Sequence, residues 1–446
     1  MRLKIKLSVV LALTCLAAGA QQKPWTFRQC LDTALQRNIT VNQARLASEL
    51  NKTNLEQVKA NRIPGVSANA SEGLFLGKNV DPTTNAFVTE AYHSTNLGLS
   101  SNYLLFNGMQ NAKTIRQNRI TVQAGESEIE RAINDVTLNI TTAYLQVLFA
   151  KEILEAAKSQ EESTTVQEER TAKMVNAGKS PESDLLQIRS QLATDNLSVV
   201  QAANQLDMAK VTLMQLMEIP VTDGFDVEVP VLEVPAVPEL QSNEEIYRKS
   251  LAAQPQILAA SLRTDASSMA LQVAEGAHWP RVNLGANLNT NYASSRKKGN
   301  VNPEGYPFFE QVWDNLGQSF SLGISIPIYS NRQIKSNIDR AKINLANTRL
   351  SEQNTRNTLR KSVEQTYADL KASARKYDAV RQQLAAVESV YSSSEKKFEV
   401  GVLSATDFLI QKNNLKQSQS GLIQAKYDYI FKQKILDFYQ GKAMGF

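Results

Sequence analysis

Residues that commonly perform catalysis or bind metals are sparse in this chain. Its two histidines are His93, in a polar stretch, and His278, just before Pro280. Neither histidine has a cysteine or a carboxylate at the spacing of a metal site, and no Gly-rich phosphate loop, nucleophile elbow or dinucleotide fingerprint occurs. The sequence therefore predicts a protein that is not an enzyme and that uses no metal or cofactor.

Two similar stretches of the chain each combine a glycine with an aspartate. Asp184 and Asp407 each lie six residues after a glycine, Gly178 and Gly401, in the stretches AGKSPESDLL and VGVLSATDFL. A glycine after a long helix is a routine C-terminal cap, and the spacing of Ser404 and Asp407 is typical of a helix N-terminal cap. A carboxylate in the first turn of a helix is also favoured by the helix dipole. Both stretches are therefore expected to be tight turns between helices.

The elements that position these turns are duplicated. Apolar residues fall seven apart on both sides of the second turn: Val363, Leu370, Tyr377, Leu384, Tyr391 and Phe398, then Phe408, Leu415, Leu422, Tyr429 and Leu436. The same phase occurs 223 residues earlier: Ile140, Val147, Leu154, Glu161, Glu168 and Val175, then Leu185, Leu192, Val199, Leu206 and Leu213. Sustained seven-residue spacing predicts, in each copy, two long helices that pack side by side.

The stretch before each hairpin predicts a helix followed by two strands. Residues 26–62 have helical spacing up to Pro64, with apolar positions at Leu31, Leu35, Ile39, Leu46, Leu50 and Leu55. A matching helix is expected over residues 243–277. Strands are expected at about residues 64–75, 95–106, 280–292 and 318–329. Residues 219–243 carry four prolines and are expected to form a linker or a small irregular domain.

The predicted strands have one apolar and one polar face. In the third strand, Val282, Leu284, Ala286, Leu288 and Tyr292 alternate with Asn283, Gly285, Asn287, Asn289 and Asn291. Such alternation over about ten residues is typical of transmembrane β-barrels, although the edge of a soluble sandwich has the same pattern. His278 and Trp279, at the start of this strand, are expected at a membrane interface, which aromatic residues favour.

The N-terminal residues indicate secretion. Residues 1–20 have a basic start, an apolar run and a small-residue cleavage site ending at Ala20, which predicts a signal peptide. Lipidation at Cys15 is the alternative. Cys30 would then be the lone cysteine of the mature chain, so no intrachain disulfide is expected, and we predict that Cys30 is a small buried apolar residue.

Charge and hydropathy exclude two further classes of protein. The formal net charge of +5 includes Arg2, Lys4 and Lys6 of the predicted signal peptide, and no basic patch indicates nucleic-acid binding. After cleavage no apolar run of about 18 residues remains, which excludes a membrane-spanning helix.

The order of these elements resembles the TolC-like outer-membrane efflux protein family. The resemblance covers essentially all of the mature chain, and its most specific parts are the duplication, Pro64, Pro280 and the two glycine-to-aspartate turns. It implies a mainly α fold with a transmembrane β-barrel, in which each chain has two repeats of helix, two strands and long helical hairpin. Three chains would form a 12-stranded barrel and a periplasmic α-helical barrel. The expected divisions are residues 1–20, 21–218, 219–243 and 244–446.

The resemblance also implies roles for both turns. Gly178, Lys179, Gly401, Val402 and Leu403 match the tips that contact a periplasmic adaptor protein. Asp407, with Asp184, matches the constriction at the periplasmic entrance. The chain departs from the family at two positions. Ile410 stands where other members often have an aspartate that forms a second ring. Leu403 stands where other members can have an arginine, which stabilises the closed state by contacting the aspartate that Asp184 matches here.

The implied function is that of an exit duct in the outer membrane of a Gram-negative bacterium, extending into the periplasm. Its partners would be two further copies of the chain, outer-membrane lipid, a periplasmic adaptor and, indirectly, an inner-membrane pump, in an efflux or type I secretion system. The pump and adaptor would select drugs, metals or proteins as cargo. The alternative is a barrel-anchored coiled-coil scaffold or adhesin without transport. The Asn-rich strand face favours the duct, because a water-filled lumen requires polar side chains.

Overall fold

The computed structural model describes residues 23–80, 85–230, 232, 234, 242–297 and 305–445. The predicted signal peptide and Cys15 lie outside these residues, as do most of residues 231–241 in the predicted linker. The chain divides into two compact units, which are described separately. The first contains the residues up to Arg45, Glu128–Ile257 and the residues from Thr355 onward, and the second contains Leu46–Ser127 and Leu258–Asn354.

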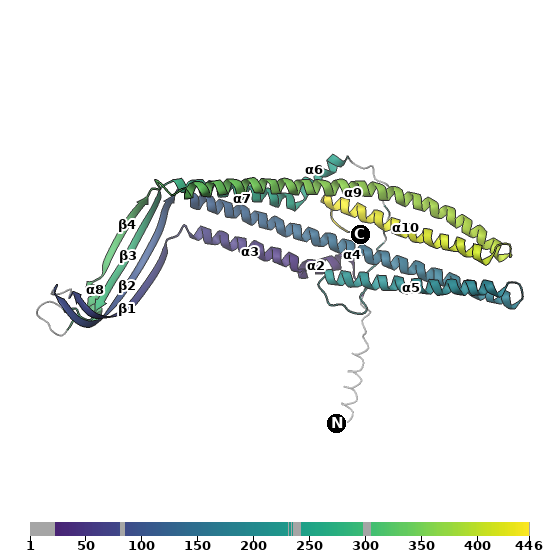
Figure 1. The fold of residues 1–446 in the computed structure, drawn as a ribbon, viewed down its shortest axis with the longest axis horizontal. Helices are drawn as coiled ribbons and strands as arrows, with labels where there is room; N and C mark the ends of the chain where they lie inside the picture. The colour runs from purple at the N-terminus through teal and green to yellow at the C-terminus, as the bar shows by residue number, and fades with distance from the viewer. Residues whose placement is uncertain are drawn as a thin grey trace, which may run out of the picture. The chain divides into compact units, whose positions relative to one another are not determined.

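Four long helices follow the predicted duplication (Figure 1). The first hairpin consists of α4 (Gln110–Asn176) and α5 (Glu182–Leu216), and the second of α9 (Gln333–Glu399) and α10 (Ala405–Tyr439). Every bound of the second hairpin lies 223 residues after its counterpart, as from Gln110 to Gln333. All residues of the predicted seven-residue series are buried or half-buried. The predicted repeat of two long helices is therefore confirmed.

The two shorter predicted helices are each divided in two, which corrects the prediction of one continuous helix. α2 (Phe27–Arg37) and α3 (Ile39–Ala60) are separated by Asn38, whose side-chain oxygen accepts hydrogen bonds from the N–H groups of Thr40 and Val41 at 2.9 and 3.3 Å. Asn38 thereby caps the start of α3. α6 (Asn243–Ala253) and α7 (Pro255–Glu275) are separated by Gln254, because proline disfavours a helical conformation in the residue before it.

The long returning helices end in the same type of turn. At the end of α5, Glu218 has φ of 54°, and the N–H of Ile219 donates to the carbonyl of Met214. At the end of α10, Gly441 has φ of 75°, and the N–H of Lys442 donates to the carbonyl of Asp437. These are left-handed helix caps that favour glycine, and the first one holds a glutamate.

The core of the first unit lies between the hairpins, α2 and part of the predicted linker. Cys30 is fully buried, as predicted, and burial raises the pKa of its thiol to about 12. Tyr144 on α4 donates a hydrogen bond to the carbonyl of Glu228 at 2.6 Å, and Lys151 donates to the carboxylate of Asp226 at 2.8 Å. The start of the predicted linker is therefore packed on the helices.

The second unit contains an antiparallel sheet with strand order β1-β2-β3-β4 (Figure 1). The strands are β1 (Gly65–Val80), β2 (Phe87–Asn107), β3 (Arg281–Ala293) and β4 (Gly317–Ser325). β1 and β2 are longer than predicted, and they pair with each other beyond the end of β3. His93 lies in β2, where a polar loop was expected. A short helix that the sequence did not predict, α8 (Phe308–Asp314), precedes β4.

Within the described part of the chain, no helix is both long and apolar enough to cross a membrane.

Candidate functional site

The register of the sheet aligns most of the apolar residues of the four strands on one face. Leu284 pairs with Tyr103 on one side and Leu322 on the other, while Leu288 pairs with Leu99. Paired residues in antiparallel strands project to the same side of a sheet. This apolar sheet face includes Val66, Leu74, Leu76, Leu99, Leu284, Leu288, Phe320, Leu322 and Ile324, all of which are exposed.

The opposite face of the sheet is mostly polar, although Phe75, Tyr92 and Leu104 also project from it. It includes Ser67, Asn69, Asn96, Ser100, Asn102, Asn283, Asn287, Asn289, Ser319 and Ser321. The hydroxyl groups of Ser67 and Ser100 lie 2.8 Å apart, across β1 and β2. A sheet with one exposed apolar face and one exposed polar face fits a boundary between lipid and water.

A β-bulge in β2 decides which residue joins the apolar sheet face near the start of β3. The register shifts between Leu104 and Phe106, so that Val282 pairs with Phe106. Uninterrupted alternation from Leu99 and Tyr103 would have placed Leu105 on the apolar sheet face. An extra residue in one strand reverses the alternation after it, which explains the difference.

The sheet has two open edges within one chain. β1 and β4 stand at the ends of the strand order, and each pairs with one described strand only. Unpaired backbone N–H and C=O groups are tolerated in water but cost several kcal/mol each in lipid. A membrane location therefore requires further strands at both edges.

Both predicted turns are helix caps built on glycine. Gly178 and Gly401 have φ of +70° and +76°, in the left-handed region that favours glycine. The N–H of Lys179 donates to the carbonyl of Met174, and the N–H of Val402 donates to the carbonyl of Lys397, both at 2.9 Å. Among the described residues, no atom lies within 4 Å of a Cβ added to either glycine.

The residues beside these glycines differ in exposure. Lys179 is exposed, and Val402 has 76% of its surface exposed. Leu403 is half-buried against Phe398 and Phe408, whose rings stack at 4.7 Å. Gly178, Lys179, Gly401 and Val402 thus form an open surface at the tips, whereas Leu403 also packs in the core of its own turn.

Both predicted constriction aspartates accept a hydrogen bond from a serine near the start of a helix. Ser404 donates to the carboxylate of Asp407 at 2.8 Å, and the N–H of Asp407 donates to the Ser404 hydroxyl at 3.1 Å. Ser180 donates to the carboxylate of Asp184 at 2.8 Å. Asp407 is exposed and Asp184 is half-buried. The capping geometry predicted for Ser404 and Asp407 is confirmed.

A buried charge that sequence reasoning missed joins the two hairpins. Asp195 on α5 is fully buried and accepts hydrogen bonds from Thr164 on α4 at 2.6 Å and from Lys416 on α10 at 3.0 Å. Gln191 donates to the same carboxylate at 3.1 Å. Burial acts to raise the pKa of Asp195, but these hydrogen bonds and the charge of Lys416 outweigh it and lower the pKa. The sequence signal that could have revealed this site is the position of Asp195. It lies three residues after Leu192, on the side of the helix that the seven-residue spacing predicts to be packed.

Lys412 is buried near this link, with 2% of its surface exposed. Burial lowers the pKa of its amine to about 8, although the carboxylates of Asp195 and Glu395 act to raise it. Three further contacts tie the hairpins nearer the tips: Arg170 to Glu399 at 2.6 Å, Thr406 to Gln187 at 3.1 Å, and Asn413 to Gln191 at 3.3 Å. The two tips are thus held side by side within one chain.

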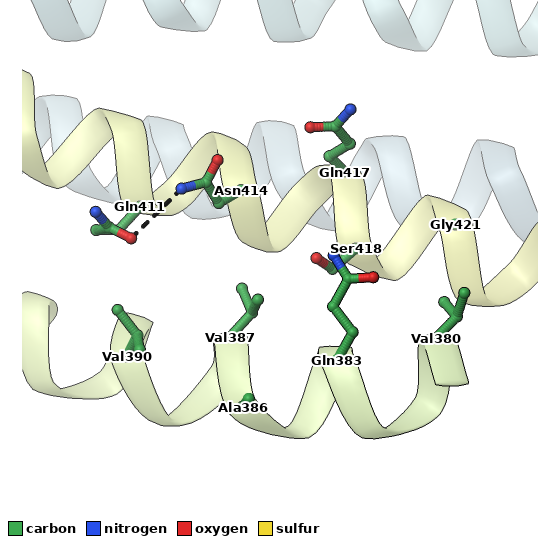
Figure 2. A pocket seen from close by; sticks show the side chains of 10 residues that line it. All are labelled: Val380, Gln383, Ala386, Val387, Val390, Gln411, Asn414, Gln417, Ser418 and Gly421. Atoms are coloured by element: carbon green, nitrogen blue, oxygen red, sulfur yellow. Dashed lines mark hydrogen bonds between the residues drawn. The ribbon is translucent and has the colours of Figure 1, made fainter. Parts of the chain in front are cut away.

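The second hairpin has a groove where the first has the Thr164–Asp195 contact. Figure 2 shows this groove between α9 and α10, with Val380 and Val387 pointing toward α10. Its volume is about 590 Å³, and Ser418 and Gly421 line it on α10. Val387 and Ser418 occupy the repeat positions of Thr164 and Asp195. The duplicated helices are therefore bound together differently in the two hairpins.

Comparisons with known proteins agree with this architecture. A family model described as "Outer membrane efflux protein" matches residues 30–217 and 246–441. Outer membrane protein TolC of Escherichia coli (strain K12) is 25% identical over 366 residues, covering 76% of this chain and 72% of that protein. Outer membrane efflux protein BepC of Brucella suis biovar 1 (strain 1330) is 22% identical over 409 residues, covering 91% and 83%.

Solved structures have the same fold. A CusC structure, from a study of transmembrane channel formation, superposes with a TM-score of 0.78 at 17% identity, covering 94% of this chain and 92% of that chain. The Campylobacter jejuni CmeC outer membrane channel superposes with a TM-score of 0.77 at 19% identity, covering 93% and 85%.

Proposed function

Because the chain belongs to the outer membrane efflux protein family, we propose that it is the exit duct of a tripartite efflux or type I secretion system. The protein lies in the outer membrane of a Gram-negative bacterium and extends into the periplasm. In the proposed role it passively conducts substrates from a periplasmic adaptor and an inner-membrane pump to the exterior. This role requires no catalysis, and we propose that the protein is not an enzyme.

The single observation that carries this proposal is the alignment of polar and apolar residues across all four strands. The apolar sheet face suits contact with lipid, and the polar face, rich in Asn, Ser and Gly, suits a water-filled lumen. An anchor without transport could instead be filled by apolar side chains. The polar face therefore favours the duct over the scaffold or adhesin.

The open edges support a trimer. Four strands cannot close a barrel, and two chains would provide eight strands, whose interior is just filled by side chains. Three chains would provide twelve strands and leave a channel, with β4 of each chain beside β1 of the next. Within each chain we propose repeats over residues 21–218 and 244–446, joined by residues 219–243.

The tips are the proposed docking site of the adaptor. Gly178, Lys179, Gly401 and Val402 are exposed and have open space around them, which leaves room for a partner hairpin. We include Leu403 in the proposed docking site as a half-buried residue next to Val402.

Asp407 and Asp184 are the proposed constriction. The Ser404 hydrogen bond engages one oxygen of Asp407, and the side chain is exposed. Three such carboxylates about 6 Å apart would repel by about 3 kcal/mol per pair at an effective dielectric near 20. A closed ring would therefore require bound cations or protonation of a carboxylate.

Conductance across a planar bilayer tests the proposed function. The purified full-length protein should insert as a trimer and conduct ions steadily. An inserted trimer that does not conduct, even after the tips are removed by proteolysis, would support the scaffold and overturn the duct.

A further inference from the structure

The short helix α8 lies on the apolar sheet face near the end of β3. The hydroxyl of Thr290 donates to the carbonyl of Val312 at 2.7 Å, and the rings of Tyr292 and Phe308 lie 5.0 Å apart. Thr290 and Tyr292 have the same strand parity as Leu284 and Leu288, so their side chains project from the apolar face. α8 therefore covers the last part of this face.

α8 is held rigidly on the strand by a buried glutamine. The side chain of Gln311 accepts a hydrogen bond from the N–H of Ala293 at 3.1 Å and donates to the carbonyl of Ala293 at 3.0 Å. Gln311 also donates to the carbonyl of Tyr306 at 2.7 Å, and Asn315 donates to the carbonyl of Asn291 at 2.7 Å. These bonds fix the middle of α8 and the residue after it to the backbone of β3, and they also link the middle of α8 to the segment before it.

The outer side of this fixed helix carries two large exposed aromatic side chains. Phe309 has 75% of its surface exposed and Trp313 has 73%. Their neighbour Gln311 is fully buried. A rigid helix that turns its polar residue inward and its aromatic rings outward is suited to an environment that is partly apolar. Aromatic rings are enriched where lipid headgroups meet acyl chains.

The distance along β3 agrees with the thickness of a bilayer. Trp279, also exposed, lies just before Arg281 at the start of β3, and α8 contacts the strand at Thr290. A strand rises about 3.3 Å per residue, so the nine steps from Arg281 to Thr290 span about 30 Å, or about 23 Å along the membrane normal at a tilt near 40°. The apolar band of an outer-membrane barrel is about 25 Å tall. Trp279 and α8 therefore stand at the two rims of one apolar band.

We propose that α8 is a membrane-interface anchor, in which Phe309 and Trp313 insert among the headgroups and upper acyl chains of the outer leaflet. The occupant is lipid because α8 continues the apolar sheet face, and this inference rests on the proposed contact of that face with the bilayer. α8 thereby sets the depth of the sheet in the membrane at its outer rim, as Trp279 does at the inner rim.

Depth-dependent fluorescence quenching tests the anchor. The chain has three tryptophans, so Trp25→Phe with Trp279→Phe leaves Trp313 as the only emitter in the full-length protein. In phosphatidylcholine vesicles, Trp313 should emit at shorter wavelength than in water. Bromine placed near the headgroup should quench it more strongly than bromine placed near the acyl terminus.

The matched protein retains Trp279 and carries Trp25→Phe with Trp313→Phe. If Trp279 is quenched by bromolipid but Trp313 is quenched only by aqueous iodide, α8 faces water and the anchor is wrong. If Trp313 is protected from both quenchers, α8 contacts a neighbouring protein chain, which also overturns the proposal. If neither tryptophan is quenched by bromolipid while the protein is folded, the proposed lipid contact of the sheet itself fails.

Discussion

Replacing Asp195 by asparagine should loosen the link between the two hairpins. The change preserves the size of the side chain but removes the charge that accepts hydrogen bonds from Thr164, Gln191 and Lys416. Hydrogen bonds to a charged group contribute about 1.5–3 kcal/mol, and breaking a fully buried ion pair costs about 3–5 kcal/mol. The side chain of Lys416 is 28% exposed and keeps some water, so we expect the lower range, about 2–3 kcal/mol.

Native-state hydrogen exchange measures this loss directly. A local loss of about 2–3 kcal/mol corresponds to amide exchange about 30- to 150-fold faster in α5 and α10 around the substitution. The matched control is Ser418→Ala, at the same repeat position of the second hairpin, which should change local stability less than Asp195→Asn because it removes no charge. Equal exchange in wild type and Asp195→Asn would refute a stabilising role for this carboxylate.

The pH dependence of the link has a definite sign. Because the folded pKa of Asp195 is lowered from 3.8, its contribution is complete above pH 3.8 and is lost as the pH falls through the folded pKa. Protection in α5 should therefore fall in acid for the wild type and much less for Asp195→Asn. A fall of the same size in both proteins would assign the acid sensitivity to other groups.

Four further predictions concern the tips, the buried Lys412 and a helix cap. Asp407→Asn, which keeps an acceptor for Ser404, should raise single-channel conductance and weaken block by trivalent cations on the periplasmic side; unchanged block would leave Asp407 as a helix cap only. Bulky or charged replacements of both Gly178 and Gly401 should abolish export while the trimer stays intact on native gels, and surviving export would contradict adaptor docking there. Because burial lowers the pKa of Lys412 from 10.5 to about 8, the free energy of unfolding should rise between about pH 8 and 10.5. Thermal melts of Lys412→Met should lack that rise, and the substitution should raise the free energy of unfolding at pH 7 by about 3 kcal/mol. Glu218→Gly should stabilise the end of α5 by about 1 kcal/mol, since φ is 54° there, and a lower melting temperature would refute the cap assignment.

Local patterns predicted the helices well and the ends of the strands poorly. The seven-residue spacing and the two turn glycines placed both hairpins, because each signal lies within one helix or one turn. Residues 76–80 of β1 and 87–94 of β2 were expected outside the strands, because the stretch between the two predicted strands is typical of a polar loop. These extensions pair with each other beyond the end of β3, and backbone hydrogen bonds form there whatever the side chains.

The sequence by itself determined the duplication, the long hairpins, the caps at Gly178 and Gly401 and the two-faced strands, since these follow from the spacing of residues along the chain. Only the tertiary structure decided which side chains meet across elements. It placed Asp195 against Lys416, 221 residues away, moved Phe106 onto the apolar sheet face through a bulge, and fixed α8 on β3 through Gln311. Such contacts depend on which surfaces pack together, and the spacing of residues within one helix or strand does not specify the neighbour that it packs against.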